Sequence, residues 1–301
     1  MKILPIALLV CAGLVSLSTA SRAAVIYAVD DSSGQSLVSF DSSAPGSYLS
    51  GVAISGLLSN ETIKGIDFRP STHELFALGS FSRLYTLNPL TGVATEVPPP
   101  GAFTPTLGGS TFGFDFNPVL DRIRVVSNTK KNYVLNPNDG SATGVTDLFY
   151  GPADPNFGVS PNVSFSAYTN SVAPAPGSTQ LYGIDSGRDI LVTQANSAGT
   201  LGTVGSLNIE VGAVGGFDIS GPGNEAFAAL LPSNESSSKL YSISLITGMA
   251  QNLGIIDGGV VISSMSIAPD NFVPGTLLPE PASLALLALS AIGMLGFRFR
   301  R

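Results

Sequence analysis

The chain has 301 residues, a formal net charge of −7 and a single cysteine, Cys11. The acidic balance excludes a surface for nucleic acid or anionic lipid, because phosphate binding depends on clustered lysine and arginine. Only 12% of the residues are charged, whereas 34 are glycine and 21 are proline, a composition typical of short strands joined by tight turns. We therefore expect an all-β fold.

The first 23 residues have the layout of a secretory signal peptide. Lys2 gives the positive start, an apolar run extends from Ile3 to Leu17, and small residues around Ala20 and Ala23 offer cleavage sites. The apolar run is shorter than the ~20 residues that a membrane-spanning helix needs. Cleavage removes Cys11, so we expect no disulfide and no cysteine-ligated metal in the exported chain.

Residues 24–270 contain a repeat with a period of about fifty residues, near that of propeller blades. The first element of each unit carries a Gly-x-Asp pattern or a degenerate form of it: 65–70, 113–118, 165–170 and 216–220. A second element follows after a polar turn: 74–78, 122–126, 180–184 and 226–230. A third ends in a turn with glycine, where positive φ costs little, and leads into a short fourth strand: 83–92, 132–140 and 239–248.

The two ends of the repeat region complement each other. Segments 26–29, 36–40 and 52–54 fit a second, third and fourth strand without a first, and segment 263–269 fits a first strand without followers. We expect a five-bladed β-propeller in which the C-terminal strand completes the first blade, leaving no long open edge. A β-sandwich or stacked array could use the same hairpins, and the middle unit, 144–180, fits least well because long loops are expected there.

Six segments occur in order between Val25 and Pro269: GIDFRP, LYTLNPLTG, GFDFNPVLDRIRVVS, AYTNS, LYGIDS and GFDIS. In these segments the chain resembles an uncharacterised domain family of exported bacterial proteins. The resemblance implies the domain boundaries and carries no assigned activity.

Asp67, Asp115 and Asp218 recur at one position of the repeat. They could converge on a cation or a sugar, since hard cations prefer several carboxylate and carbonyl oxygens. Alternatively, each carboxylate accepts hydrogen bonds from backbone N–H groups and fixes a turn of its own blade. The recurrence of the aspartate from blade to blade favours this structural role. The sequence contains no zinc, phosphate-loop or nucleophile motif, so we expect no metal, no cofactor and no catalytic residue.

Asp121, Arg122 and Arg124 depart from the pattern of the other blades. The two arginines alternate along a strand and therefore share a face. Their guanidinium groups match planar anions, which makes them candidates for binding a uronic acid, and pairing with acids of a neighbouring blade is the alternative. His73, the only histidine, lies in a polar turn and is expected to be solvated.

The chain ends with a linker (271–281) that contains the triplet Pro279, Glu280 and Pro281, then an apolar stretch and a basic tail with Arg298, Arg300 and Arg301. An apolar run followed by arginines is typical of a membrane helix under the positive-inside rule, so residues 282–301 are predicted to form a transmembrane helix and basic tail. These elements resemble the PEP-CTERM sorting signal of Gram-negative bacteria that make extracellular polysaccharide. The resemblance implies an exosortase-type sorting enzyme as partner, transient inner-membrane anchoring and delivery to the cell surface or extracellular matrix. The residues that carry it are Pro279, Glu280, Pro281, Arg298, Arg300 and Arg301.

Two functions remain open at this point. The first is a non-enzymatic surface or matrix protein whose propeller binds another protein or an extracellular polysaccharide. The second is an extracellular polysaccharide hydrolase or lyase acting in the propeller channel. Two carboxylates about 5 to 9.5 Å apart in an open cleft would favour catalysis, and buried carboxylates bonded to backbone would count against it.

Overall fold

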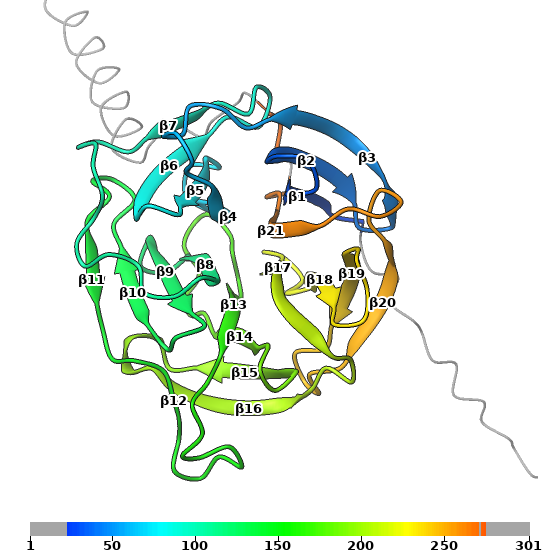
Figure 1. Ribbon diagram of the computed structural model, residues 1–301. Helices are drawn as coiled ribbons and strands as arrows, with labels where there is room; N and C mark the ends of the chain where they lie inside the picture. Colours follow the sequence, from blue (N-terminus) through cyan, green and yellow to red (C-terminus); the bar gives the residue numbers. More distant parts are fainter. Residues whose placement is uncertain (1–22, 271, 275–301) are drawn as a thin grey trace, which may run out of the picture.

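The computed structural model describes residues 23–270 and 272–274. Five antiparallel-based sheets stand around a central axis, which confirms the five-bladed β-propeller (Figure 1). The predicted transmembrane helix and all six sorting residues lie outside the described part. Within the described part, no helix has the length and apolarity to cross a membrane.

Each blade is a sheet whose first strand lies nearest the axis (Figure 1). Blade 1 contains β21 (Ile262–Ile267), β1 (Val25–Asp30), β2 (Ser36–Asp41) and β3 (Ala44–Ala53). Blade 2 contains β4 (Ile63–Phe68), β5 (Leu75–Gly79), β6 (Arg83–Leu87) and β7 (Ala94–Glu96). Blade 3 contains β8 (Phe112–Asn117), β9 (Arg122–Ser127), β10 (Asn132–Leu135) and β11 (Ala142–Gly144). Blade 5 contains β17 (Val211–Ile219), β18 (Ala226–Pro232), β19 (Lys239–Ile243) and β20 (Ala250–Ile255).

Blade 4 differs from the four-stranded pattern. Its strands are β13 (Val163–Tyr168), β14 (Leu181–Asp185), β15 (Ile190–Gln194) and β16 (Thr200–Ser206), with a 3₁₀ turn, η1 (Asn196–Ala198), before β16. A fifth strand, β12 (Phe149–Tyr150), pairs in parallel with β16 on the outer edge. In the loop after β12, the carboxylate of Asp154 accepts bonds from the N–H (2.5 Å) and hydroxyl (2.9 Å) of Thr203. The long loop expected in this unit is therefore fastened to the blade.

The C-terminal strand closes the ring as expected. β21 pairs antiparallel with β1, with Ile26 opposite Ile267 and Ala28 opposite Met265. Without this pairing, one edge of β1 and one edge of β21 would be exposed. The pairing of the two strands removes both exposed edges. One expected boundary was wrong: the outer strand of blade 1 already begins at Ala44 and not near Val52.

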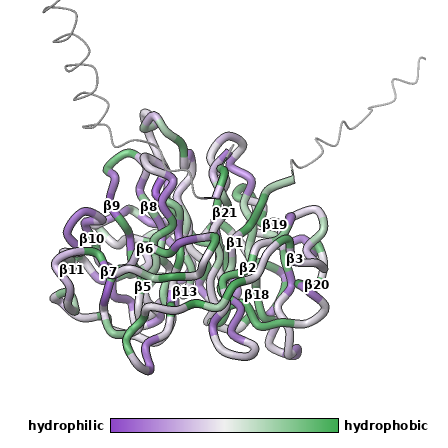
Figure 2. The backbone as a smooth tube through the Cα atoms, turned by 90° about the horizontal axis from the view of Figure 1, so that it is seen from above, coloured by the Kyte–Doolittle hydropathy of each residue, from purple (hydrophilic) through white to green (hydrophobic). Residues whose placement is uncertain are grey.

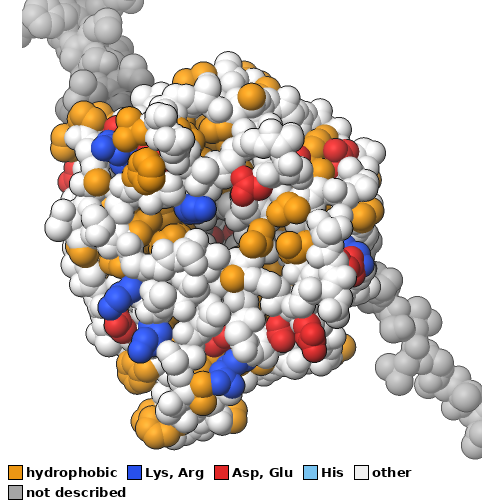
Figure 3. Space-filling view, viewed as in Figure 1, with side chains coloured by type: hydrophobic (Ala, Val, Ile, Leu, Met, Phe, Trp, Pro, Cys, Tyr) orange, Lys and Arg blue, Asp and Glu red, His pale blue; other side chains and the backbone are white. Residues whose placement is uncertain are grey.

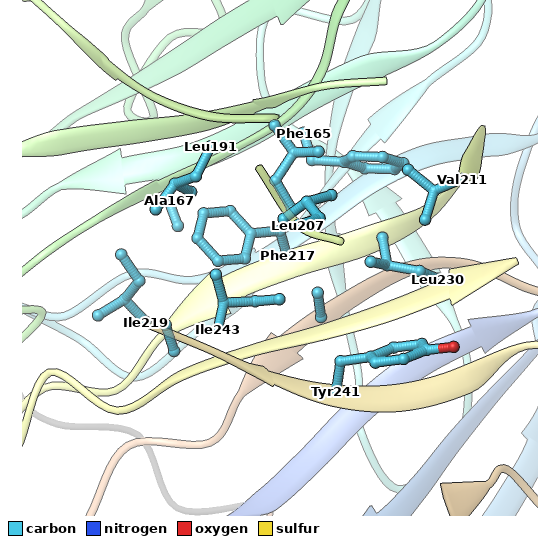
Figure 4. Packing of buried hydrophobic residues seen from close by; sticks show 13 residues of the cluster. Phe165, Ala167, Leu191, Leu207, Val211, Phe217, Ile219, Leu230, Tyr241 and Ile243 are labelled. Carbon is cyan, nitrogen blue, oxygen red and sulfur yellow. The ribbon is translucent and has the colours of Figure 1, made fainter. Parts of the chain in front are cut away.

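Apolar side chains fill the space between neighbouring blades. Figure 2 shows hydrophobic stretches along the strands and hydrophilic stretches mainly in the connecting loops. The largest of these clusters joins blades 4 and 5, where Phe165, Phe217 and Leu230 pack together (Figure 4). Full burial of one such side chain stabilises the fold by about 1.5–3 kcal/mol.

The repeated glycines allow the inner strands to approach one another closely. A Cβ added to Gly113 would lie 2.5 Å from the backbone nitrogen of Ser166, and one added to Gly216 would lie 2.3 Å from that of Met265. Both contacts are with backbone of the next blade, which cannot move aside. The glycine of the repeated motif is therefore required by blade-to-blade distance.

Candidate functional site

The inner strands place one equivalent residue from each blade around the channel. These residues are Ser266 (blade 1), Asp67 (blade 2), Asp115 (blade 3), Ala167 (blade 4) and Asp218 (blade 5). The three aspartates are 2–5% exposed, and each offers an oxygen that lies within 4.8 Å of those of the others. We call these five positions the channel layer. Seen along the ring axis, the centre of the molecule is hollowed (Figure 3).

Each aspartate of the channel layer bonds to the backbone of the next blade around the ring. The N–H donors and carboxylate acceptors are Phe116 to Asp67 (2.7 Å), Tyr168 to Asp115 (2.9 Å) and Ile267 to Asp218 (2.6 Å). An inner strand has one edge towards the channel, so these N–H groups lack a strand partner and need another acceptor. The structural role expected for the aspartates takes a different form here, because they connect neighbouring blades.

The two positions without aspartate explain the rest of the pattern. The side chain of Ala167 in blade 4 cannot accept a hydrogen bond from the N–H of Ile219 in blade 5. That N–H instead donates to the carboxylate of the preceding residue in the same blade, Asp218 (2.6 Å). Ser266 accepts from the N–H of Phe68 (3.3 Å), and its hydroxyl donates to Asp67 (2.7 Å) with Asp218 as a second, longer acceptor (3.1 Å). Ser266 therefore still provides a hydrogen bond from one blade to the backbone of the next, whereas Ala167 does not.

Burial raises the pKa of all three aspartates. The charge of neighbouring carboxylates raises the pKa of Asp67 and Asp115 further. Burial raises the pKa of Asp218 to about 6, and bonds from backbone N–H groups limit that rise. The hydrogen bond between Asp115 and Asp218 raises the pKa of Asp115 and lowers that of Asp218.

The channel layer does not have the geometry of a glycosidase. Its carboxylates are buried and mutually closer than the ~5–9.5 Å that two catalytic carboxylates need for a sugar between them. Three oxygens at this spacing could ligate one hard cation, and protonation is the other way to relieve their repulsion. Because backbone N–H groups already engage each carboxylate, the layer first of all joins blades.

Asp121, Arg122 and Arg124 are not part of the channel layer, although Arg124 lies directly opposite Asp115 in the pairing of β9 with β8. Asp121 receives two bonds from the guanidinium of Arg69 (2.9 and 2.5 Å), which ties blade 2 to blade 3. The side chain of Arg122 donates to the backbone oxygen of Asp121 (2.8 Å). Arg124 is 4% exposed and reaches three neutral oxygens, those of Tyr168 (3.3 Å), Asn132 (2.8 Å) and Ser197 (3.2 Å).

A cavity of about 820 Å³ opens at one end of the channel. Blades 1, 2 and 5 and the loop after β13 line it, and Asp67 and Asp218 contribute to its wall. His73 also lines it, with a φ of 61° and with burial lowering its pKa. Ala23, Ala24 and Pro274 belong to the same lining, so both ends of the described chain lie on this face (Figure 2).

An aromatic cluster on the wall of this cavity was not predicted. Phe272 lies in the expected linker, yet its ring packs edge-on against Phe68 (4.7 Å between centroids) and Tyr27 (5.9 Å). Tyr27 and Phe68 belong to strands of blades 1 and 2 and pack against each other at 5.4 Å. The large aromatic residue after the last strand was the one signal in the sequence that could have indicated this contact.

Comparison with solved structures gives matches of low similarity. A hydrazine synthase from Kuenenia stuttgartiensis is 14% identical over 64% of this chain, with a TM-score of 0.38, and this chain spans 49% of its length. A chain of a nidogen/laminin complex is 11% identical over 82% of this chain and 98% of its own, with a TM-score of 0.45. A putative 6-phosphogluconolactonase from Bacteroides uniformis is 14% identical over 82% of this chain and 72% of its own, with a TM-score of 0.39.

No curated protein matches the chain. One family model does, over residues 36–266, and its description is a domain of unknown function, DUF4394. The match begins at β2 and ends one residue before the end of β21, so it covers nearly the whole propeller. The chain therefore belongs to the DUF4394 family.

Proposed function

We propose that this chain is an exported, non-catalytic binding protein of the cell surface or matrix, and that the cavity at the channel mouth is its ligand site. The cavity carries the proposal: its volume of about 820 Å³ falls within the ~300–1,000 Å³ of small-ligand sites. Several blades contribute to its wall, as expected for a propeller that binds at its axis. The buried, backbone-bonded carboxylates of the channel layer favour binding over polysaccharide cleavage.

The sorting part of the proposal rests on the sequence of the two ends. The signal-peptide pattern of residues 1–23 and the Pro-Glu-Pro, apolar and arginine elements of residues 279–301 support export followed by exosortase-type processing. Extracellular polysaccharide is the first ligand class to test, because the resemblance of the tail connects such signals with cells that make it. A surface protein is the second.

Two experiments test these parts separately. Fractionation of a Gram-negative host should find the full chain at the membrane or surface, and a variant lacking residues 279–301 should be released into the soluble exported fraction. Retention of that variant in the membrane would contradict the sorting signal. An array of extracellular glycans and surface proteins, probed with the exported chain, tests binding; the absence of any ligand that competes at the cavity would contradict the binding function.

A further inference from the structure

The closing strand β21 is connected to the ring differently from the other inner strands (Figure 1). In blades 2 to 5, the inner strand continues through a turn or loop into the second strand of the same sheet. β21 is not connected in this way to its partner β1, which lies at the other end of the chain. β21 can therefore separate from the ring without disturbing a covalent connection between paired strands, and the other inner strands cannot.

Hydrogen bonds to the channel layer hold the C-terminal half of β21. The N–H of Ile267 donates to Asp218 (2.6 Å), and the hydroxyl of Ser266 donates to Asp67 (2.7 Å), with Asp218 as the longer acceptor (3.1 Å). Ser266 also accepts from the N–H of Phe68 (3.3 Å). Two of the three carboxylates of the channel layer thus bond to β21. The attachment of this half of the strand therefore depends on the charge state of these carboxyls.

The groups around these carboxyls do not neutralise them. Asp67 in β4, Asp115 in β8 and Asp218 in β17 each offer an oxygen within 4.8 Å of those of the others. The other strands against which β17 packs, β13, β18 and β21, contain no lysine, arginine, aspartate or glutamate. Tyr168 of β13 is titratable, and burial raises the pKa of its phenol. Arg124 of β9 reaches neutral oxygens. Ionisation of the layer therefore brings like charges together where water is excluded.

The direction of the pH effect follows from burial. Burial raises the pKa of Asp67 and Asp115, and raises that of Asp218 to about 6. A carboxyl with a raised pKa stabilises the folded state below its ordinary pKa, and this contribution is lost as the pH rises through the raised value. His73, which lines the same cavity, acts in the opposite direction, because burial lowers its pKa. Loosening with rising pH therefore comes from the carboxyls.

The segment that follows Ser266 forms part of the wall of the cavity at the channel mouth. Its described residues in the lining are Ile267, Ala268, Pro269, Asp270, Phe272 and Pro274. Besides the bonds to the channel layer, this segment is held by the N–H of Ala268, which donates to the backbone oxygen of Val25 (2.8 Å), and by the aromatic contacts of Phe272. Separation of the segment from the ring would therefore open the cavity along one side.

We propose that β21 is a pH-sensitive closure of the ring, which is attached while the channel layer is protonated and separates at its C-terminal half when the layer ionises. The cavity is complete in the first state and open along one side in the second. This inference does not depend on the proposed binding function, because it concerns the ring itself.

Hydrogen–deuterium exchange of the protein, purified after export, tests the proposal. The opening equilibrium of the amides in β21 is compared with that of β8, an inner strand connected to its own blade, at pH 4.5 and pH 7.5. Rates are corrected for intrinsic exchange at each pH. The ratio of the two opening equilibria, β21 to β8, should rise at least about tenfold between these pH values. An equal change in both strands, or no change in either, would overturn the proposal.

A pair of variants identifies the titrating group. Asp218→Asn keeps an acceptor for the N–H of Ile267 and removes the charge, so it should abolish most of the pH dependence of the ratio. Glu210→Gln removes an exposed acid outside the channel layer and should leave that dependence unchanged. Thermal melting checks the fold of both. Full pH dependence in a folded Asp218→Asn variant would overturn the proposal.

A chelator distinguishes the proton from a bound cation as the means of neutralising the layer. The exchange of the wild type is measured with and without EDTA, and the same pH dependence is expected in both. A dependence that develops only after chelation would show that a cation holds the closing strand at neutral pH, and would overturn the proposal.

Discussion

The two junctions on either side of blade 4 are built in different ways. Towards blade 3, the carboxylate of Asp115 holds the N–H of Tyr168, and Arg124 reaches the hydroxyl of the same tyrosine. Towards blade 5, the channel position is Ala167, and Phe165 and Phe217 belong to a large apolar cluster instead (Figure 4). At the level of the channel layer, one junction thus uses a carboxylate and the other uses apolar packing.

The contrast shows that the repeated aspartate is one of two means of holding blades together. A carboxylate satisfies a backbone N–H that faces the channel, but it introduces buried negative charge. Apolar packing avoids the charge and leaves the N–H to find an acceptor within its own blade, as Ile219 does with Asp218. The predictions below test these two means of joining blades and the attachment of Phe272 to the ring.

The largest effect is expected at the apolar junction. Phe217→Ala should lower the free energy of unfolding by about 3–5 kcal/mol, because a 4% exposed ring leaves a cavity between two rigid sheets. Chemical denaturation monitored by tyrosine fluorescence measures it. Phe217→Leu, which retains most of the volume, is the matched control and should lose clearly less; a loss below about 1 kcal/mol in the alanine variant would contradict the apolar account.

A pH change should act on the carboxylates of the channel layer, through Asp218 in particular. The pKa of Asp218 is raised to about 6 in the folded state, so its stabilising contribution is complete below its ordinary pKa and is lost as the pH rises through about 6. The free energy of unfolding should therefore fall by about 2 kcal/mol between pH 4.5 and pH 7.5. The groups that face this carboxyl are Asp67, Asp115 and Ser266, and none of the three aspartates forms an ion pair with lysine or arginine among the described residues.

Asp218→Asn provides the control for the pH dependence. The amide oxygen can still accept from Ile267, while the titrating charge is gone. Denaturation curves of this variant should change less between the two pH values than those of the wild type. If the free energy of unfolding of this variant changes with pH as much as that of the wild type, groups other than Asp218 cause the pH dependence.

At the polar junction, removal of the acceptor should cost less than removal of the apolar ring. Asp115→Ala leaves the N–H of Tyr168 buried without a partner and should lower the free energy of unfolding by about 1–3 kcal/mol. Asp115→Asn keeps an acceptor for that N–H and should be clearly more stable than Asp115→Ala. If the two variants are equally unstable, the hydrogen bond is not the cause.

The smallest effect is expected where the chain leaves the ring. Phe272→Ala removes a half-buried ring from Phe68 and Tyr27 and should cost about 1 kcal/mol, measured by thermal melting. Phe272→Leu keeps apolar contact and serves as control. A melting temperature identical to the wild type in both would show that the aromatic cluster does not hold the closing strand.

The sequence predicts the blades well because their causes are local. Glycine recurs in three of the five inner strands, β4, β8 and β17, and in the turn after the third strand of blades 2, 3 and 5, so the repeat is visible. The closing strand follows from the missing first strand of blade 1. The parallel strand β12 was missed, since its two residues, Phe149 and Tyr150, carry no alternating pattern.

The candidate site is less predictable because its contacts cross between blades. The recurring position of Asp67 is evident, but its partner, Phe116, comes from the next repeat. The pair of Arg69 with Asp121 joins residues 52 positions apart, and no local pattern indicates it. The wall of the cavity is formed by residues of several blades that come together only when the ring is closed. No single segment of the sequence therefore indicates the cavity.

The placement of both ends has a consequence for access. Ala24 and Pro274 stand on the wall of the same cavity, so anything attached beyond Pro274 begins at its threshold. A membrane anchor attached at this point would place the bilayer next to the cavity opening and leave the opposite face of the propeller exposed to solvent. If the anchor proposed above is removed by the sorting enzyme, the same step would free this face of the ring.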